Sequence, residues 1–222
     1  MKAIKVPESL KPIWDSFVAN SPQASLLQSW DWGRFNQAHG EEILRLAITS
    51  SQFSKGQEFL EAKSEMLATM LLIKRSLGSK IAYYYAPHGP ILAPDQTKEA
   101  LELLLKKTEE QARENGIAFL RLEPKLNLDQ YLNIEPESDT VQAQYTLILD
   151  ISPPPEDILK QMKSKHRYNI RLAKRKGVKI SKAETIQEID RFWQLMEQGS
   201  DENQFQTHPK DYYLKQFEIL SE

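Results

Sequence analysis

Cysteine is absent from the 222-residue chain, and histidine occurs only four times. A chain without thiols has no disulfides, no thiolate nucleophile and no cysteine metal site. The histidines lack the close spacing of zinc ligands; they are His39, His88, His166 and His208. The composition therefore argues against a metal centre and against covalent catalysis by cysteine.

Long apolar runs are also lacking. No stretch approaches the roughly 20 apolar residues that cross a bilayer, and the first residues lead into Pro7 and Glu8 rather than into a signal-peptide core. Hydrophobic residues make up 40% of the chain, as in a soluble globular protein, and the length allows one large domain or one domain plus part of another. We therefore expect a cytoplasmic protein.

Acidic residues are missing between Asp157 and Glu184, over residues 158–183, which we call the basic segment. It holds ten of the 29 basic side chains, so the rest of the chain has 19 basic against 31 acidic side chains. A solvated helix face is one interpretation. An ordinary exposed helix, however, mixes signs to gain pairs between residues four apart, and a strip of one sign on an acidic chain indicates a polyanionic partner.

The basic segment has the periodicity of an amphipathic helix with one buried stripe and a row of cations on another face. Gly177 predicts the end of this helix, and a short strand is expected over residues 178–181. The stripe comprises Leu159, Met162, His166, Ile170 and Ala173, and the row comprises Lys163, Arg167, Arg171 and Lys174.

Before the basic segment, the apolar pattern predicts the order helix, helix, three antiparallel strands, helix and strand. This order suits an α/β (α+β) fold of the acetyltransferase (GNAT) type with a mixed, largely antiparallel sheet. The expected helices are residues 8–20, a short one from Trp30, and 97–115; the expected strands are 42–49, 66–74, 80–85 and 117–122.

A domain boundary is expected at residues 150/151, next to three consecutive prolines. Residues 1–150 would form the first acetyltransferase-like subdomain, ending in a strand over 145–149. Residues 151–222 would begin a second, incomplete subdomain of the same type, with the basic helix and helices over 185–196 and 209–220. Self-association or a partner could complete it.

Residues 75–80 superficially resemble the pyrophosphate-binding loop of coenzyme A enzymes. Lys80 breaks the last position of that pattern, and a strand follows instead of a helix whose N-terminus could bind phosphate. We interpret these residues as a hairpin turn, which argues against a coenzyme A-dependent N-acyltransferase.

Three further blocks contain polar and aromatic residues of interest. Residues 28–35 contain two tryptophans within three residues, which indicates either a ligand site or a core corner capped by Ser29 or Asp31. Residues 83–90 are a strand that ends in a Pro/Gly loop, where ligand-contacting groups often lie. Residues 208–213 allow two interpretations: a ligand site, or only the start of a helix whose tyrosines pack against the protein.

Together these blocks resemble the Fem family of peptidoglycan bridge-forming aminoacyltransferases. The most specific block is residues 165–173 followed by Gly177 and Val178; the others are residues 28–35, residues 85–90, and Phe192 and Trp193 followed by His208, Tyr212 and Tyr213. The resemblance spans nearly the whole chain, and it corresponds to the N-terminal two-thirds of a family member.

The resemblance implies transfer of an amino acid from aminoacyl-tRNA to the stem peptide of a peptidoglycan precursor, on the cytoplasmic side or peripherally at the inner face of the membrane. It implies no cofactor. It nominates four residues for the phosphates, Arg34, Lys165, Arg167 and Arg171, and places Tyr85 and His88 near the peptide end. Apart from the resemblance, the ordinary pKa of histidine and the loop position make His88 a candidate general base.

Three departures weaken that transfer of roles. Asn36 and His88 stand where relatives commonly have a lysine and an arginine, and residues 199–205 lack the usual threonine and arginine. The alternatives are a non-catalytic module that binds tRNA or a phosphorylated precursor, and the coenzyme A-dependent enzyme.

Overall fold

The computed structural model describes residues 1–50, 65–78, 81–94, 97–128, 131–132, 140–143 and 145–221. The chain divides into two compact units, residues 1–142 with 208–222, and residues 143–207. The division thus lies at residues 142/143 rather than at 150/151, and the last helix is part of the first unit.

The first unit contains a six-stranded sheet in the order β1-β2-β3-β4-β6, with β5 paired to β3. All pairs are antiparallel except β4 with β6, so the predicted mixed, largely antiparallel sheet and the β2-β3-β4 meander are confirmed. The strands are β1 (Lys2–Lys5), β2 (Ile43–Thr49), β3 (Met66–Leu77), β4 (Ile81–His88), β5 (Ile91–Leu92) and β6 (Phe119–Pro124).

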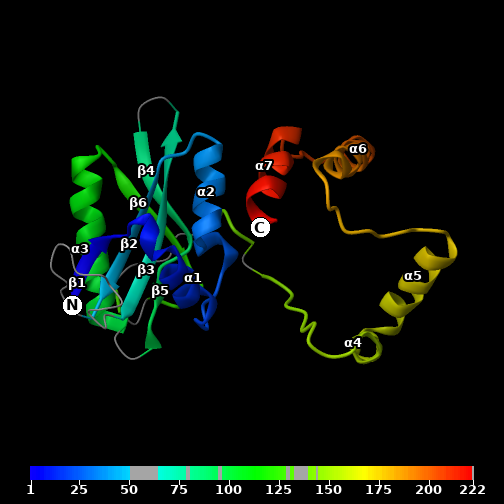
Figure 1. Cartoon of the computed structure of the whole chain (residues 1–222), viewed down its shortest axis with the longest axis horizontal. Helices are drawn as coiled ribbons and strands as arrows, with labels where there is room; N and C mark the ends of the chain where they lie inside the picture. Colours follow the sequence, from blue (N-terminus) through cyan, green and yellow to red (C-terminus); the bar gives the residue numbers. More distant parts are fainter. Residues whose placement is uncertain are drawn as a thin grey trace. The chain divides into compact units, whose positions relative to one another are not determined.

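Helices cover both faces of this sheet (Figure 1). The helix predicted from residue 8 begins as a 3-10 turn, because Pro12 occupies the first turn of α1 and has no N–H to donate. The helical elements are η1 (Glu8–Leu10), α1 (Lys11–Ala19), η2 (Leu26–Gln28), α2 (Trp30–Ala38), α3 (Thr97–Glu114) and α7 (Lys210–Leu220).

The core lies on the two faces of β3, whose residues 66–73 are all buried. Met70 and Leu72 pack in the cluster that includes the apolar stripe of α3, whereas Leu71 packs in the cluster with Trp14 and Trp30. The capped core corner predicted around residues 28–35 is confirmed, because Trp30 is buried and the Ser29 hydroxyl accepts a hydrogen bond from the N–H of Trp32 at 3.1 Å.

The last helix, α7, packs against α2. The ring of Tyr212 lies edge-on to Phe35, with centroids 4.9 Å apart, and stacks on His208 at 3.9 Å. The packed helix start predicted for residues 208–213 is therefore confirmed for Tyr212.

The second unit contains α4 (Pro155–Gln161), α5 (Ser164–Arg175) and α6 (Ile186–Asn203). The single basic helix predicted from the sequence was wrong. Met162 and Lys163 adopt extended backbone conformations and separate α4 from α5. The expected buried stripe is also absent, since neither helix has a buried residue in the described unit.

The strands predicted at residues 145–149 and 178–181 were also wrong for the described structure. Both segments have apolar, strand-favouring side chains, but Tyr145, Leu147 and Ile148 are 87%, 93% and 87% exposed. A strand forms only with a neighbour to pair with, and within the described ranges no neighbour pairs with either segment.

Candidate functional site

One group of predicted residues lies at the carboxyl ends of β4 and β6. These two strands run parallel, with Tyr85 opposite Arg121 and His88 opposite Pro124. Ligands of open α/β sheets commonly bind beyond the carboxyl ends of such strands. The end of β4 is therefore the place in the first unit where a reacting group would be expected.

Tyr85 belongs to a hydrogen-bond network centred on Glu123. The Glu123 carboxylate accepts hydrogen bonds from the Tyr85 hydroxyl at 2.8 Å, from the N–H groups of Val141 and Gln142 at 2.7 and 3.0 Å, and from Arg121 Nε at 3.2 Å. The Gln142 side chain also donates to the Tyr85 oxygen at 3.1 Å. Tyr85 thus holds the start of the connection to the second unit.

Electrostatics in this network keep Glu123 ionised and Tyr85 protonated. Burial alone would raise the pKa of Glu123, but the donors around its carboxylate, led by the N–H of Val141, bring that pKa below its ordinary value. Burial and the neighbouring carboxylate raise the pKa of Tyr85. Tyr85 is therefore a hydrogen-bond donor rather than a proton acceptor.

His88 ends β4 in a left-handed backbone conformation with φ of 53°. Its ring nitrogen Nδ1 lies 2.8 Å from the hydroxyl oxygen of Ser25, which precedes η2. Burial and the charge of Lys125 lower the pKa of His88, against the smaller opposing effect of Glu123. The ring is therefore neutral near pH 7, as a general base must be.

The buried side chain of Gln28 fixes this strand end. Its Nε2 donates to the carbonyl of Pro87 at 2.8 Å, and its Oε1 accepts from the N–H of Leu71 at 2.9 Å. Any side chain at Gly89 would meet this amide, because a Cβ there would lie 2.6 Å from Nε2. Gln28 thus joins η2 to β3 and β4 in the way a strand backbone would.

Arg34, a predicted phosphate ligand, lies on α2 beside Asp31. Its guanidinium donates to Asp31 at 3.3 Å, and Asp31 also accepts from Lys11 at 2.8 Å. The Lys11 ammonium also reaches Asp15 at 3.1 Å. Arg34 therefore belongs to an ion-pair network on α1 and α2.

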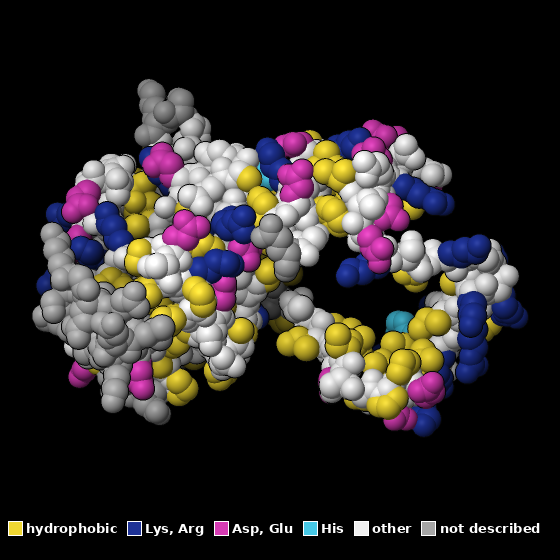
Figure 2. All heavy atoms as spheres, viewed as in Figure 1, with side chains coloured by type: hydrophobic (Ala, Val, Ile, Leu, Met, Phe, Trp, Pro, Cys, Tyr) yellow, Lys and Arg dark blue, Asp and Glu magenta, His cyan; other side chains and the backbone are white. Residues whose placement is uncertain are grey.

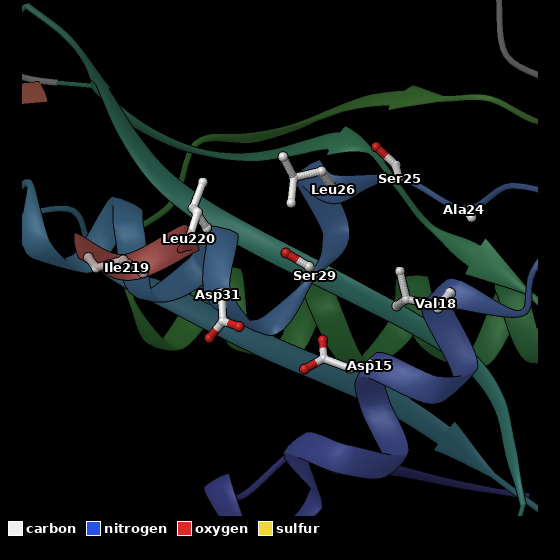
Figure 3. Close-up of a pocket in the computed structure, with 10 residues that line it drawn as sticks. Asp15, Val18, Ala24, Ser25, Leu26, Ser29, Asp31, Ile219 and Leu220 are labelled. Atoms are coloured by element: carbon white, nitrogen blue, oxygen red, sulfur yellow. The ribbon is translucent and has the colours of Figure 1, made fainter. Parts of the chain in front are cut away.

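A cavity of about 540 Å³ lies beside this network (Figure 3). Ser25, Ser29, Asp15 and Asp31 supply its polar wall, and apolar side chains that include Leu26 and Leu220 supply the rest.

The other predicted residues, Lys165, Arg167 and Arg171, all lie on α5. Arg167 and Arg171 are four residues apart and share a face, whereas Lys165 is two residues from Arg167 and lies on another. Arg167 Nη1 donates to the carbonyl of Met162 and, at 3.5 Å, to that of Lys160. This guanidinium therefore closes the corner between α4 and α5.

A hollow of about 540 Å³ on α5 is lined by Tyr168, Arg171, Lys174 and Arg175. Figure 2 shows the dark-blue basic side chains gathered over this helix. Among the ten basic side chains of the basic segment, Lys160 pairs with Asp157 at 2.7 Å. In the described part of the chain, no carboxylate forms a salt bridge with any of the other nine.

Sequence reasoning did not identify Ser25, Glu123 or Arg175 as functional residues, whereas Lys174 was already part of the predicted row of cations. Ser25 stands three residues before Gln28, a spacing typical of helix starts, and that signal marks a cap rather than a partner for His88. Among the described residues, no three His, Cys, Asp or Glu side chains are grouped to hold a metal ion. None of the described helices is long and apolar enough to cross a membrane.

Comparison with known proteins connects these two regions to one family. The model of the FemAB family matches residues 11–139 and 134–222. Two similar proteins are the lipid II:glycine glycyltransferases of Staphylococcus haemolyticus and Staphylococcus epidermidis, which are 21% and 22% identical over 94% of this chain. The chain spans about half the length of these relatives, 50% and 51%.

A solved structure has the same fold over almost the whole chain. The crystal structure of FemX superposes with a TM-score of 0.77 and covers 99% of this chain and 55% of its own, at 19% sequence identity.

Proposed function

Because this chain belongs to the FemAB family, we propose that it is an aminoacyltransferase of cell-wall synthesis. The donor would be an aminoacyl-tRNA, and the acceptor would be the amine of a peptidoglycan precursor's stem peptide. The names of the relatives support a lipid-linked precursor and a glycyl group. The proposed reaction would need no cofactor and would take place in the cytoplasm or at the inner face of the membrane; both remain predictions from the sequence.

The observation that carries the proposal is the unpaired cationic face of α5. Arg171, Lys174 and Arg175 line one hollow with Tyr168, and no described carboxylate neutralises them. Both proposed substrates carry phosphates, and arginine offers a fork of donors that matches phosphate oxygens. This face is therefore suited to hold a diphosphate or an RNA backbone.

The chemical step would require little of the protein. An aminoacyl ester is already activated, so the site must align the amine with the carbonyl carbon, accept a proton and stabilise the oxyanion. His88 is the candidate proton acceptor, because it is neutral near pH 7 and lies at the end of β4. Tyr85 would act beside it by positioning the chain, since its hydroxyl is already bonded to Glu123.

A non-catalytic binding module is the second candidate. The same α5 face favours it, because phosphate binding by itself requires no reacting group. The coenzyme A-dependent enzyme is less well supported. The predicted hairpin is confirmed by the pairing of Ser76 with Ala82 and of Leu77 with Ile81; residues 79 and 80 lie outside the described residues.

A transfer assay tests the proposal. The purified chain is incubated with lipid II and tRNA charged with labelled glycine, with acetyl-CoA as the control donor. Label on lipid II from glycyl-tRNA alone is the expected result. Precursor binding without transfer from any charged tRNA would support the non-catalytic binding module. Acetylation of the precursor would identify the coenzyme A-dependent enzyme.

A further inference from the structure

The backbone of His88 is held in a conformation that few residues other than glycine adopt. Its φ of 53° lies in the left-handed region, which is strained for a residue with a side chain. Such a conformation persists where the surroundings fix it. Here the preceding carbonyl, of Pro87, is bound by Gln28, and the following Gly89 lies directly against the same Gln28 amide.

The His88 ring is held as firmly as the backbone. Ser25 Oγ lies 2.8 Å from Nδ1, and the same oxygen accepts a hydrogen bond from the N–H of Leu27 at 3.2 Å. A hydroxyl oxygen has two acceptor lone pairs and one proton. With one lone pair engaged by Leu27, the second can accept a proton from Nδ1.

The hydroxyl proton of Ser25 then requires a hydrogen-bond acceptor other than Nδ1. Ser25 lines the cavity of about 540 Å³ beside α1 and α2, where water can accept that proton (Figure 3). With the ring proton on Nδ1, this arrangement leaves the lone pair on Nε2.

The charged groups around the ring favour its neutral form. Lys125 lowers the pKa of His88 in addition to burial, while Glu123 has a smaller opposing effect. The Lys125 ammonium also donates to the carbonyl of Ala24 at 2.7 Å, next to Ser25 in the chain. Lys125 thus fixes both the segment that carries Ser25 and the charge state of the ring.

We propose that Ser25 is a positioning residue that holds His88 in the Nδ1-protonated tautomer, so that Nε2 accepts the proton of the attacking amine. This inference rests on the proposed aminoacyl transfer. The amine nitrogen bonds to the ester carbonyl carbon, and its proton passes to Nε2. The bond from that carbon to the ribose oxygen then breaks, and the imidazolium returns the proton to the leaving oxygen, which gives an amide and a free hydroxyl.

Nitrogen NMR of the imidazole tests the tautomer without any substrate. In the wild-type chain at neutral pH, Nδ1 should give the signal of a protonated nitrogen and Nε2 that of an unprotonated one. Ser25→Ala should lose this distinction, and Ser25→Thr should keep it. The matched control is Ser29→Ala, which removes the N-cap hydroxyl of α2 in the same cavity and should leave the His88 signals unchanged.

Kinetics test the catalytic consequence. Ser25→Ala should lower kcat roughly ten- to hundredfold, by analogy with the loss when the hydrogen-bond partner of a metal-ligating histidine is removed, with KM unchanged and with recovery in Ser25→Thr. A proton on Nε2 in the wild type, or an unchanged Ser25→Ala spectrum, would overturn the assignment. A wild-type chain without transfer activity would instead overturn the proposed function, and the spectra would still decide the tautomer.

Discussion

The Tyr85 hydroxyl donates a 2.8 Å hydrogen bond to Glu123 Oε2 and thereby connects β4 to its parallel neighbour β6. The same carboxylate accepts from the backbone of Val141 and Gln142, the last residues of the first unit before the chain enters the second. One carboxylate thus joins the strand that carries His88 to the segment that leads towards α5.

Glu123→Gln should destabilise the chain at neutral pH by about 1–3 kcal/mol, because hydrogen bonds to a charged group are replaced by weaker ones. The folded-state pKa of Glu123 is below its ordinary value of 4.5, so its contribution is present above that value and lost as the pH falls further. The difference between variant and wild type should therefore shrink in acid.

Urea unfolding at neutral pH and at about pH 3 measures this difference. Glu102→Gln on the exposed side of α3 is the control, and it should stay within about 0.5 kcal/mol of wild type. If the free energy of unfolding differed between Glu123→Gln and wild type by the same amount at both pH values, the role of the Glu123 charge would be contradicted.

Gln28→Leu should be strongly destabilising although it preserves the side-chain volume. It leaves the N–H of Leu71 and the carbonyl of Pro87 without the partners they have in the buried strand end, at about 1–3 kcal/mol for each group. Chemical denaturation measures the loss. Gln37→Leu, at an exposed position of α2, should change stability little. Similar losses of stability in the two variants would contradict the role of the Gln28 hydrogen bonds to Leu71 and Pro87.

Arg167→Ala should loosen the corner between α4 and α5 rather than weaken phosphate binding. The guanidinium donates to carbonyls of that corner, so its loss should speed amide exchange at the start of α5 by roughly fivefold, which corresponds to about 1 kcal/mol. Lys165→Ala, on another face of α5, is the control. A loss of phosphate affinity with unchanged exchange would restore Arg167 as a phosphate ligand.

Local sequence patterns predicted the elements whose structure depends on local periodicity. Residues 97–115 have an apolar stripe at helical spacing, and α3 follows it to within one residue. The meander was also predicted, because residues 66–74 are a long apolar run between a polar stretch of sequence and the glycine at position 78. The strands β1 and β5 were not, since four and two residues carry too little pattern and their strand character comes from pairing with β2 and β3.

The parts that could not be predicted depend on distant contacts. No proline or glycine marks the break at Met162 and Lys163. Tyr85 and His88 could be nominated from their loop, but their partners lie 38 and 63 residues away, at Glu123 and Ser25. Only tertiary structure brings such pairs together. Residues 145–149 and 178–181 in the second unit likewise have the composition of strands, but no strand among the described residues pairs with them.

The most direct test of the account measures the affinity for a diphosphate-bearing peptidoglycan precursor as a function of salt. Arg171, Lys174 and Arg175 are replaced together by alanine, with Lys165→Ala as the control on another face of α5. The account predicts at least a roughly tenfold loss of affinity at low salt and a shallower salt dependence for the triple variant alone. Unchanged affinity and slope in the triple variant would contradict it.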